Sequence, residues 1–414
     1  MNKVSDLAAT VSAEIDAARE ELISLCGALV AAESVNPPGR TAQVTEVVRR
    51  YLGANGVASE LIQADDEAPN VLAQIAGASG GRHVVFNAHM DTMEAGDEGA
   101  WSVPVFRLTR RGGRLYGLGL GNMKGALAAM CVTSAVLHRH RNVWSGRLSM
   151  TAVSDEVMFG ERGTVFLLRA RPDLAGDFLV SGEGPGFMGL AAAEKGLLWL
   201  DIEARAPGGH ASRAMRGQTA VMRLASLLAR LDAMNDIYAT LPRELEGVSG
   251  GEGNLGLRLS LNAGTIAAGT VRSQVAPDAR AALDVRLPPG ISAETCEAMI
   301  RKHAAEADAG GNMNIRVVKS WDANWTALDN PLTLALGQAV QNVRGERPAL
   351  VVRLPGSDAR RWRDLGVPAV CYGPQPTLSA GIDDYVNEQD VIDCAKIYAR
   401  TALALMQASS AGSL

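Results

Sequence analysis

The stretch 84–91, Val-Val-Phe-Asn-Ala-His-Met-Asp, constrains the fold more than any other part of this chain. A short apolar run rich in β-branched residues is typical of a buried strand. In an open α/β sheet, ligands bind beyond the carboxyl ends of the strands. His89 is therefore a candidate metal ligand, and Asp91 would fix the tautomer of its imidazole. Alone, the pair also fits a structural histidine in the core.

Two further apolar strands end in acidic residues. The run 148–153 is followed by Asp155 and Glu156, and the run 178–180 is followed shortly by Glu183. One such strand end can occur by chance, but three strands that end in His/Asp, Asp/Glu and Glu occur together by chance far less often. We therefore expect these side chains to meet at one edge of a sheet.

The remaining pattern predicts an α/β protein with a second, inserted domain. Helices are expected at 11–32, 41–55, 126–138, 331–343 and 388–407, and strands at 58–63, 70–75 and 368–372. Between residues 197 and 319 the order changes to strand-helix-strand-strand-helix-strand, which is the ferredoxin-like arrangement. We predict a catalytic domain with a mostly parallel sheet from residues 1–193 and 321–414, and an α+β lid domain at 194–320.

Composition limits the classes of partner. The chain has 414 residues, a net charge of −5 and five cysteines without CxxC spacing. This balance predicts neither nucleic acid nor membrane as a partner, and the scattered cysteines fit a reducing compartment. With no apolar signal core near the N-terminus, we expect a cytoplasmic protein that acts on a small molecule.

Several motifs together resemble the acetylornithine deacetylase, succinyl-diaminopimelate desuccinylase and carboxypeptidase G family of metallohydrolases. The matching stretches are 89–92, 115–125, 155–164, 182–183, 209–212, 275–277, 284–286 and 356–359. The resemblance implies a zinc-peptidase-like catalytic domain and a lid that dimerises, so a homodimer is expected. It also implies two divalent metals, bridged by an aspartate and a water, and a glutamate base that deprotonates this water.

The metal positions depart from the family pattern. By resemblance, the first metal takes His89, Asn122 and Glu183, and the second takes Asn122, Val157 and Ala380. Asn122 occupies the position at which the family has aspartate. Val157 and Ala380 occupy the positions at which the family has a glutamate and a histidine. An amide oxygen is a weak zinc ligand, so the second site is expected to be empty.

Two alignments compete around Glu156. The ungapped one makes Glu156 the base and puts Val157 at the ligand position. The other makes Asp155 the base and Glu156 the ligand, at the cost of an extra residue before Gly160. We favour the ungapped alignment.

The resemblance assigns further roles in substrate binding. His210 would reach the site of the partner subunit and stabilise the oxyanion, with a helix-capping role as the alternative. Arg286 would grip a substrate carboxylate, and a salt bridge within the lid is its alternative. Gln274 stands where relatives carry asparagine. The loop at Gly356, Ser357 and Asp358 would face the substrate with its backbone, with a plain turn as the alternative.

We therefore predict a hydrolase of an amide or amidine-like C–N bond in a small carboxylate-bearing substrate. It would use Glu156 as base and one divalent metal, zinc, manganese or cobalt, at the first site. Two alternatives stay open: a metal-independent enzyme in which Glu156 is a general acid/base, and a non-catalytic homologue that binds a ligand or partner.

Overall fold

The computed structural model describes residues 3–308, 310–376 and 381–407 and divides into two compact units. The first unit comprises 1–192, 325–350 and 357–414, and the second comprises 193–324 and 351–356. The expected boundaries at 193 and 320 lie one and four residues from this division. The segment 351–356, assigned from sequence to the catalytic domain, groups with the second unit instead.

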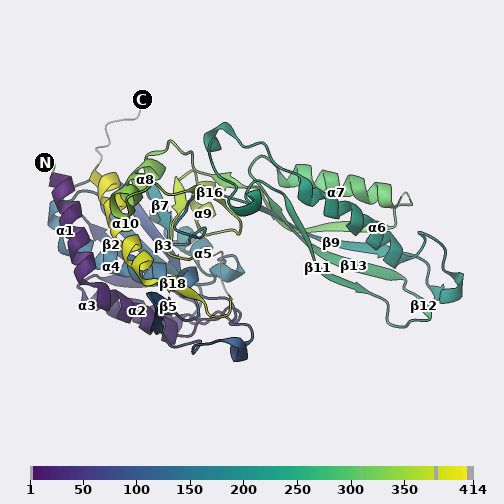
Figure 1. Ribbon diagram of the computed structural model, residues 1–414, viewed down its shortest axis with the longest axis horizontal. Coiled ribbons are helices and arrows are strands. Elements are labelled where there is room, and N and C mark those ends of the chain that lie inside the picture. The colour runs from purple at the N-terminus through teal and green to yellow at the C-terminus, as the bar shows by residue number, and fades with distance from the viewer. Residues whose placement is uncertain (1–2, 309, 377–380, 408–414) are drawn as a thin grey trace. The chain divides into compact units, whose positions relative to one another are not determined.

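The first unit is built on a mixed sheet, of which β2, β3 and β7 are labelled in Figure 1. Its strands follow the order β1, β2, β6, β3, β7, β17, β8. Its centre is parallel, as predicted, because β3 pairs in parallel with both β6 and β7, and β17 pairs in parallel with β7. Antiparallel pairs flank this centre. The bounds are β1 Ser59–Gln63, β2 Pro69–Ala76, β3 His83–His89, β6 Arg147–Val153, β7 Phe178–Ser181, β8 Leu190–Glu194 and β17 Ala369–Cys371.

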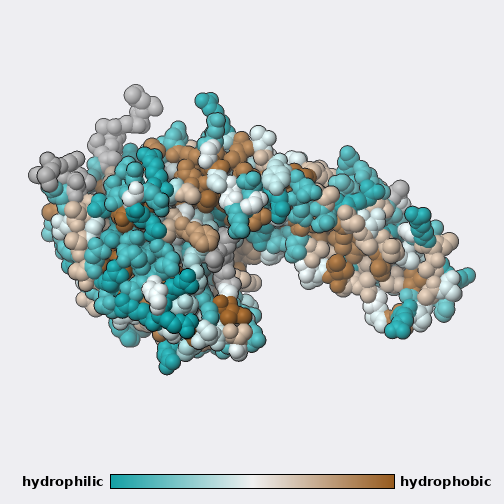
Figure 2. Space-filling model, viewed as in Figure 1, coloured by the Kyte–Doolittle hydropathy of each residue, from teal (hydrophilic) through white to brown (hydrophobic). Residues whose placement is uncertain are grey.

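Helices cover both faces of this sheet. On one face α3, α4 and α10 contact the strands and enclose the main hydrophobic core. On the other face α5 and α9 contact the strands, and Leu167 of α5 belongs to a smaller, separate core with Leu72 and Val153. Hydrophilic residues dominate the visible surface around α2 and α10 (Figure 2), as expected for helices with one buried face. The bounds are α1 Lys3–Ala17, α2 Arg19–Ala31, α3 Ala42–Ala54, α4 Gly125–Arg139, α5 Thr164–Ala170, α8 Pro331–Arg344, α9 Ala359–Asp364 and α10 Glu388–Gln407.

One predicted helix differs in the structure, and one helix is unusually apolar. The predicted helix 11–32 is two helices, α1 and α2, which meet at Ala18. Residues 120–139, which include α4, are the one helical stretch of the described chain that is long and apolar enough to cross a membrane. However, 94% of its most apolar window is buried within the protein, as in the core helix of a globular domain.

The second unit has the ferredoxin-like order that the sequence predicted. Its strands lie in the order β11, β13, β9, β14, and α6 and α7 pack on them around a separate core. The bounds are β9 Gly196–Arg205, α6 Ala220–Asp232, β11 Ser260–Ala268, β13 Asp278–Leu287, α7 Ala293–Ala307 and β14 Met313–Trp321.

Short strands complete the fold. In the first unit β4, β5 and β18 form a small sheet, and in the second unit β10 pairs with β12. The strands β15 and β16 lie where the chain passes between units. Their bounds are β4 Thr109–Arg111, β5 Arg114–Tyr116, β10 Gly209–His210, β12 Gln274–Val275, β15 Asn324–Trp325, β16 Leu350–Arg353 and β18 Tyr385–Asn387.

Candidate active site

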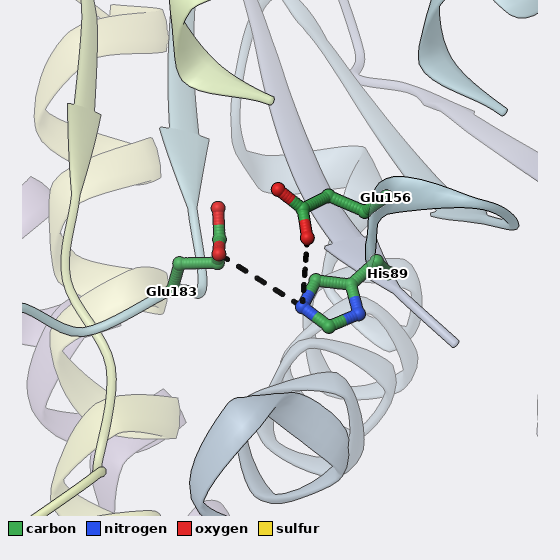
Figure 3. A group of neighbouring side chains, drawn as sticks. All are labelled: His89, Glu156 and Glu183. Atoms are coloured by element: carbon green, nitrogen blue, oxygen red, sulfur yellow. Dashed lines mark ion pairs between the residues drawn. The ribbon is translucent and has the colours of Figure 1, made fainter. Parts of the chain in front are cut away.

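Three side chains converge at the carboxyl edge of the central sheet (Figure 3). His89 ends β3, Glu156 lies in the turn after β6, and Glu183 lies two residues after β7. The His89 Nε2 atom is 3.8 Å from Glu156 Oε2 and 3.9 Å from Glu183 Oε1. The three strands end together because β3 pairs in parallel with both neighbours. The structure therefore brings together the residues that the sequence singled out at three separate strand ends.

The imidazole of His89 is oriented by its other nitrogen. Its Nδ1 lies 2.8 Å from the backbone carbonyl oxygen of Asp91, to which it donates, and 3.4 Å from the Asp91 carboxylate. Nε2 is buried and has no hydrogen-bond partner among the described residues. With Nδ1 bonded to the carbonyl, Nε2 faces the two glutamates, which is how a ligating histidine is usually held.

Asp91 links the histidine to the Glu156 turn. Its carboxylate accepts hydrogen bonds from the backbone N–H groups of Glu156 and Val157, at 3.1 and 3.0 Å, and from the Asn36 side chain at 2.8 Å. Burial raises the pKa of Asp91, but these bonds and His89 outweigh it, so the pKa lies below its usual value. Asp91 is thus a buried anion that positions both His89 and Glu156.

The charges of the cluster favour a cation. Burial raises the pKa of Glu156 well above its usual value, and the neighbouring Glu183 adds to this effect. Burial lowers the pKa of His89, but Asp91, Glu156 and Glu183 outweigh it and raise this pKa to about 10. A group of carboxylates around a buried imidazole nitrogen stabilises positive charge there, whether a proton or a metal ion.

The cluster of His89, Glu156 and Glu183, two of which belong to the expected first metal position, fits a divalent cation. Each of His89, Glu156 and Glu183 offers one ligand atom, and these atoms all lie within 4.8 Å of one another. Imidazole and carboxylate are ordinary ligands of zinc and of manganese. The buried Nε2 without a hydrogen-bond partner is the atom that such a cation would satisfy.

The second metal position does not fit a cation. Asn122 and Val157 line a cavity of about 10 Å³ with Thr92, Met93, Leu118, Gly119 and Asp384. The valine offers no ligand, the amide is neutral, and the Asp384 carboxylate already accepts from the N–H groups of Gly119 and Gly121. Ala380, the third expected position, lies outside the described residues. The cavity holds no more than about one water.

Asp155 lies apart from the cluster. Its carboxylate accepts hydrogen bonds from the side chains of Asn36, at 3.2 Å, and Arg162, at 3.1 Å. In the structure Glu156, not Asp155, faces His89. Asn36 bridges the carboxylates of Asp91 and Asp155. Asn36 was not singled out from the sequence, because no local pattern marks this contact.

Asp358 adds a further buried acid. Its Oδ2 accepts a hydrogen bond of 3.0 Å from Asn87, which lies two residues before His89 on β3. Burial and the charge of Glu183 raise the pKa of Asp358 to about 6. Beside it, Ser357 is buried and contacts Cys371. The sequence predicted a substrate-facing backbone at Gly356 to Asp358 and did not foresee this buried carboxylate.

Three of the expected substrate contacts belong to the second unit. His210 is exposed, and its Nδ1 contacts Ser212 at the start of a short 3-10 turn. Gln274 pairs with His210 across β10 and β12. Arg286 forms two hydrogen bonds to Asp284 on the same strand, at 2.7 and 2.9 Å. This is the salt bridge given above as the alternative for Arg286, and its role toward a substrate stays a prediction.

Comparison with known proteins identifies the family of this chain. A model of peptidase family M20/M25/M40 matches residues 85–404. Succinyl-diaminopimelate desuccinylase of Paracoccus denitrificans (strain Pd 1222) is 28% identical over 387 residues, which are 91% of this chain and 96% of the relative.

Solved structures share the fold at low sequence identity. Human carnosine dipeptidase 1 superposes with a TM-score of 0.75 at 16% identity, over 97% of this chain and 99% of that one. A Bacillus subtilis protein described as a dinuclear metal binding peptidase of family M20 has a TM-score of 0.69 at 14% identity, over 95% and 99%. Because the family model spans most of the chain and includes all three clustered side chains, this protein is a hydrolase that belongs to peptidase family M20/M25/M40.

Proposed function

We propose that this protein hydrolyses the amide bond of a small carboxylate-bearing substrate, such as an N-acyl amino acid, and that it works with one divalent cation. The observation that carries the proposal is the convergence of His89, Glu156 and Glu183 within 4.8 Å. His89 and Glu183 would hold the cation, and Asn122 offers a further oxygen, Oδ1, which has no hydrogen-bond partner among the described residues. Such a cation polarises a carbonyl and acidifies a water.

Glu156 would move the proton. Its backbone N–H is fixed by Asp91, and its carboxylate lies beside His89 and Glu183. A raised pKa suits a residue that takes a proton from water and returns it to the leaving amine, because it lies nearer the working pH. The desuccinylase of Paracoccus, by its name, removes a succinyl group from an amine, which supports amide hydrolysis as the reaction class.

The test is metal content together with turnover. The purified protein, dialysed and then loaded with zinc, manganese or cobalt, is expected to retain about one metal per chain. The variant His89→Ala should lose it, whereas His138→Ala, at the far end of α4, should not. A screen of N-acyl amino acids then measures hydrolysis. Two metals per chain would contradict the assignment at Val157. Turnover without metal would favour the metal-independent alternative.

We also propose that the second unit forms a homodimer. His210 is exposed on β10, and the resemblance to dimeric relatives is what supports this arrangement. Light scattering coupled to gel filtration tests it, and a mass of one chain at micromolar concentration would contradict it.

A further inference from the structure

Three exposed apolar side chains follow the site residues in the chain. Met93 comes two residues after Asp91, Met158 two residues after Glu156, and Phe187 four residues after Glu183. Their exposed fractions are 49%, 47% and 80%. The three loops that carry them leave the same edge of the parallel centre of the sheet as the cluster does. We call Met93, Met158 and Phe187 the apolar rim.

The turn at Phe187 is held so that its ring stays outside. Phe187 and Met188 both have positive φ, 51° and 56°, a conformation that non-glycine residues rarely adopt. Met188 is buried in the main core and contacts the sulfur of Cys394, while the N–H of Phe187 donates to the carbonyl of Gln375. With Met188 anchored inward, the ring of Phe187 is directed into solvent, where an apolar ligand would gain by covering it.

The apolar character continues inward from the rim. Met93 also lines the cavity of about 10 Å³ beside Asn122, where Leu118 and Val157 are its neighbours. Charge argues in the same direction. The carboxylates of Glu156 and Glu183 lie 3.8 and 3.9 Å from His89 Nε2, so a second carboxylate near the scissile bond would meet like charges.

We propose that the apolar rim receives an apolar group next to the scissile amide, a hydrophobic acyl chain or an apolar amino-acid side chain, and that succinyl-type acids are disfavoured there. The inference rests on the proposed function, because it names the substrate class of the same site. Full burial of one methylene group increases binding affinity by a factor of about four. A rim that is open on one side should provide about half of that free energy, which corresponds to a factor of about two in affinity.

The experiment uses two series of substrates with the metal-loaded protein. In the first, acetyl, butyryl, hexanoyl, octanoyl and succinyl groups are attached to one amino acid. In the second, N-acetyl amino acids carry side chains of rising apolar size. We expect kcat/KM to rise about two- to fourfold per methylene in at least one series, and the succinyl compound to fall below the butyryl compound of equal carbon number.

Two matched variants tie the effect to the rim. Phe187→Ser should flatten the dependence on chain length, whereas Val143→Ser should keep it. Val143 is 63% exposed and precedes β6 at the opposite edge of the sheet. No dependence on apolar size in either series, or succinyl faster than butyryl, would overturn the inference.

The failure of the proposed function is a separate outcome. If no amide is cleaved, calorimetric binding of the octanoyl and succinyl compounds still decides the inference. Tighter binding of octanoyl, lost in Phe187→Ser, supports the apolar rim, and equal or weaker binding overturns it.

Discussion

Among the residues of the site, Glu156 has the most specific proposed chemical role, that of the general base. Its carboxylate shares a buried space with His89 and Glu183, so its removal should affect proton transfer more than it affects binding. We expect Glu156→Gln to lower kcat by about 10²- to 10⁴-fold, the usual contribution of a general base. Steady-state kinetics and substrate binding by calorimetry measure the two effects separately.

The control for this variant is Glu161→Gln, an exposed glutamate five residues further along the same turn, which should keep full activity. Loss of bound metal in Glu156→Gln would mean that Glu156 is a ligand and not the base. The competing alignment, with Asp155 as base, would then need to be reconsidered.

Asn36 is a second residue with a definite expected effect. Its amide donates to both Asp91 and Asp155, two carboxylates that are nearly inaccessible to solvent. Asn36→Ala removes a donor from each, and we expect a loss of about 1–3 kcal/mol in the free energy of unfolding. A lower kcat should accompany it because Asp91 positions His89. Urea denaturation and kinetics measure these effects.

Asn342→Ala serves as the comparison for Asn36→Ala. Asn342 is exposed on α8, so its replacement should change stability by no more than about 0.5 kcal/mol. Equal effects of the two substitutions would show that the Asn36 bridge does not stabilise the site.

The sequence was a good guide to the site where a side chain ends a patterned strand. His89, Glu156 and Glu183 were each predictable because an apolar run precedes them, and parallel pairing brings such ends together. Asn36 and Asn87 were not, because the partners of a buried amide lie far away in the chain. Asp358 was noticed as part of a loop motif, but its buried carboxylate depends on packing that no local pattern encodes.

At the level of elements, the loops after β7 and β17 are packed against each other at two glycines. A Cβ atom at Gly373 would lie 2.0 Å from the carbonyl oxygen of Gly182, next to Glu183. Gly373→Ala should therefore cost at least about 1–3 kcal/mol of stability by overpacking and should also weaken metal binding. Urea denaturation and metal titration measure both.

A glycine in α8 provides the opposite expectation. A Cβ atom at Gly337 would have no neighbour within 4 Å, and the residue lies inside a helix. Gly337→Ala should stabilise the protein by up to about 1 kcal/mol, because alanine is the better helix former. If Gly337→Ala and Gly373→Ala both destabilised the protein, the close contact with Gly182 would not explain the loss of stability in Gly373→Ala.

Most elements of both units were predictable from periodicity, and the exceptions have a physical reason. The helix expected at 11–32 is interrupted at Ala18, a residue with high helix propensity, so no breaker marks the boundary between α1 and α2. The strand β8, Leu190–Glu194, is short and rich in alanine, which favours helices in isolation. Its pairing with β17 is a tertiary effect that overrides this preference.

Among the residues that the structure describes, each unit has a main hydrophobic core of its own. Since the candidate metal site belongs to the first unit, a bound cation should stabilise that unit by mass action. Calorimetry is expected to show two unfolding transitions, and zinc at one hundred times its Kd should raise the free energy of one of them by about 2.7 kcal/mol. A shift of both transitions, or of neither, would contradict this assignment, and His89→Ala should abolish the shift.

The position of β17 within the central sheet has a consequence for how the protein is made. β17 lies between β7 and β8, although it follows them by about 190 and 180 residues in the chain. On a ribosome that adds roughly 5–20 residues per second, β7 would wait roughly 10–40 seconds for this neighbour. During that interval its open edge is a site where nascent chains can pair wrongly. Slower translation of the codons for residues 193–324 should therefore lower the yield of native protein. Ribosome-associated chaperones, which bind nascent chains, should restore this yield.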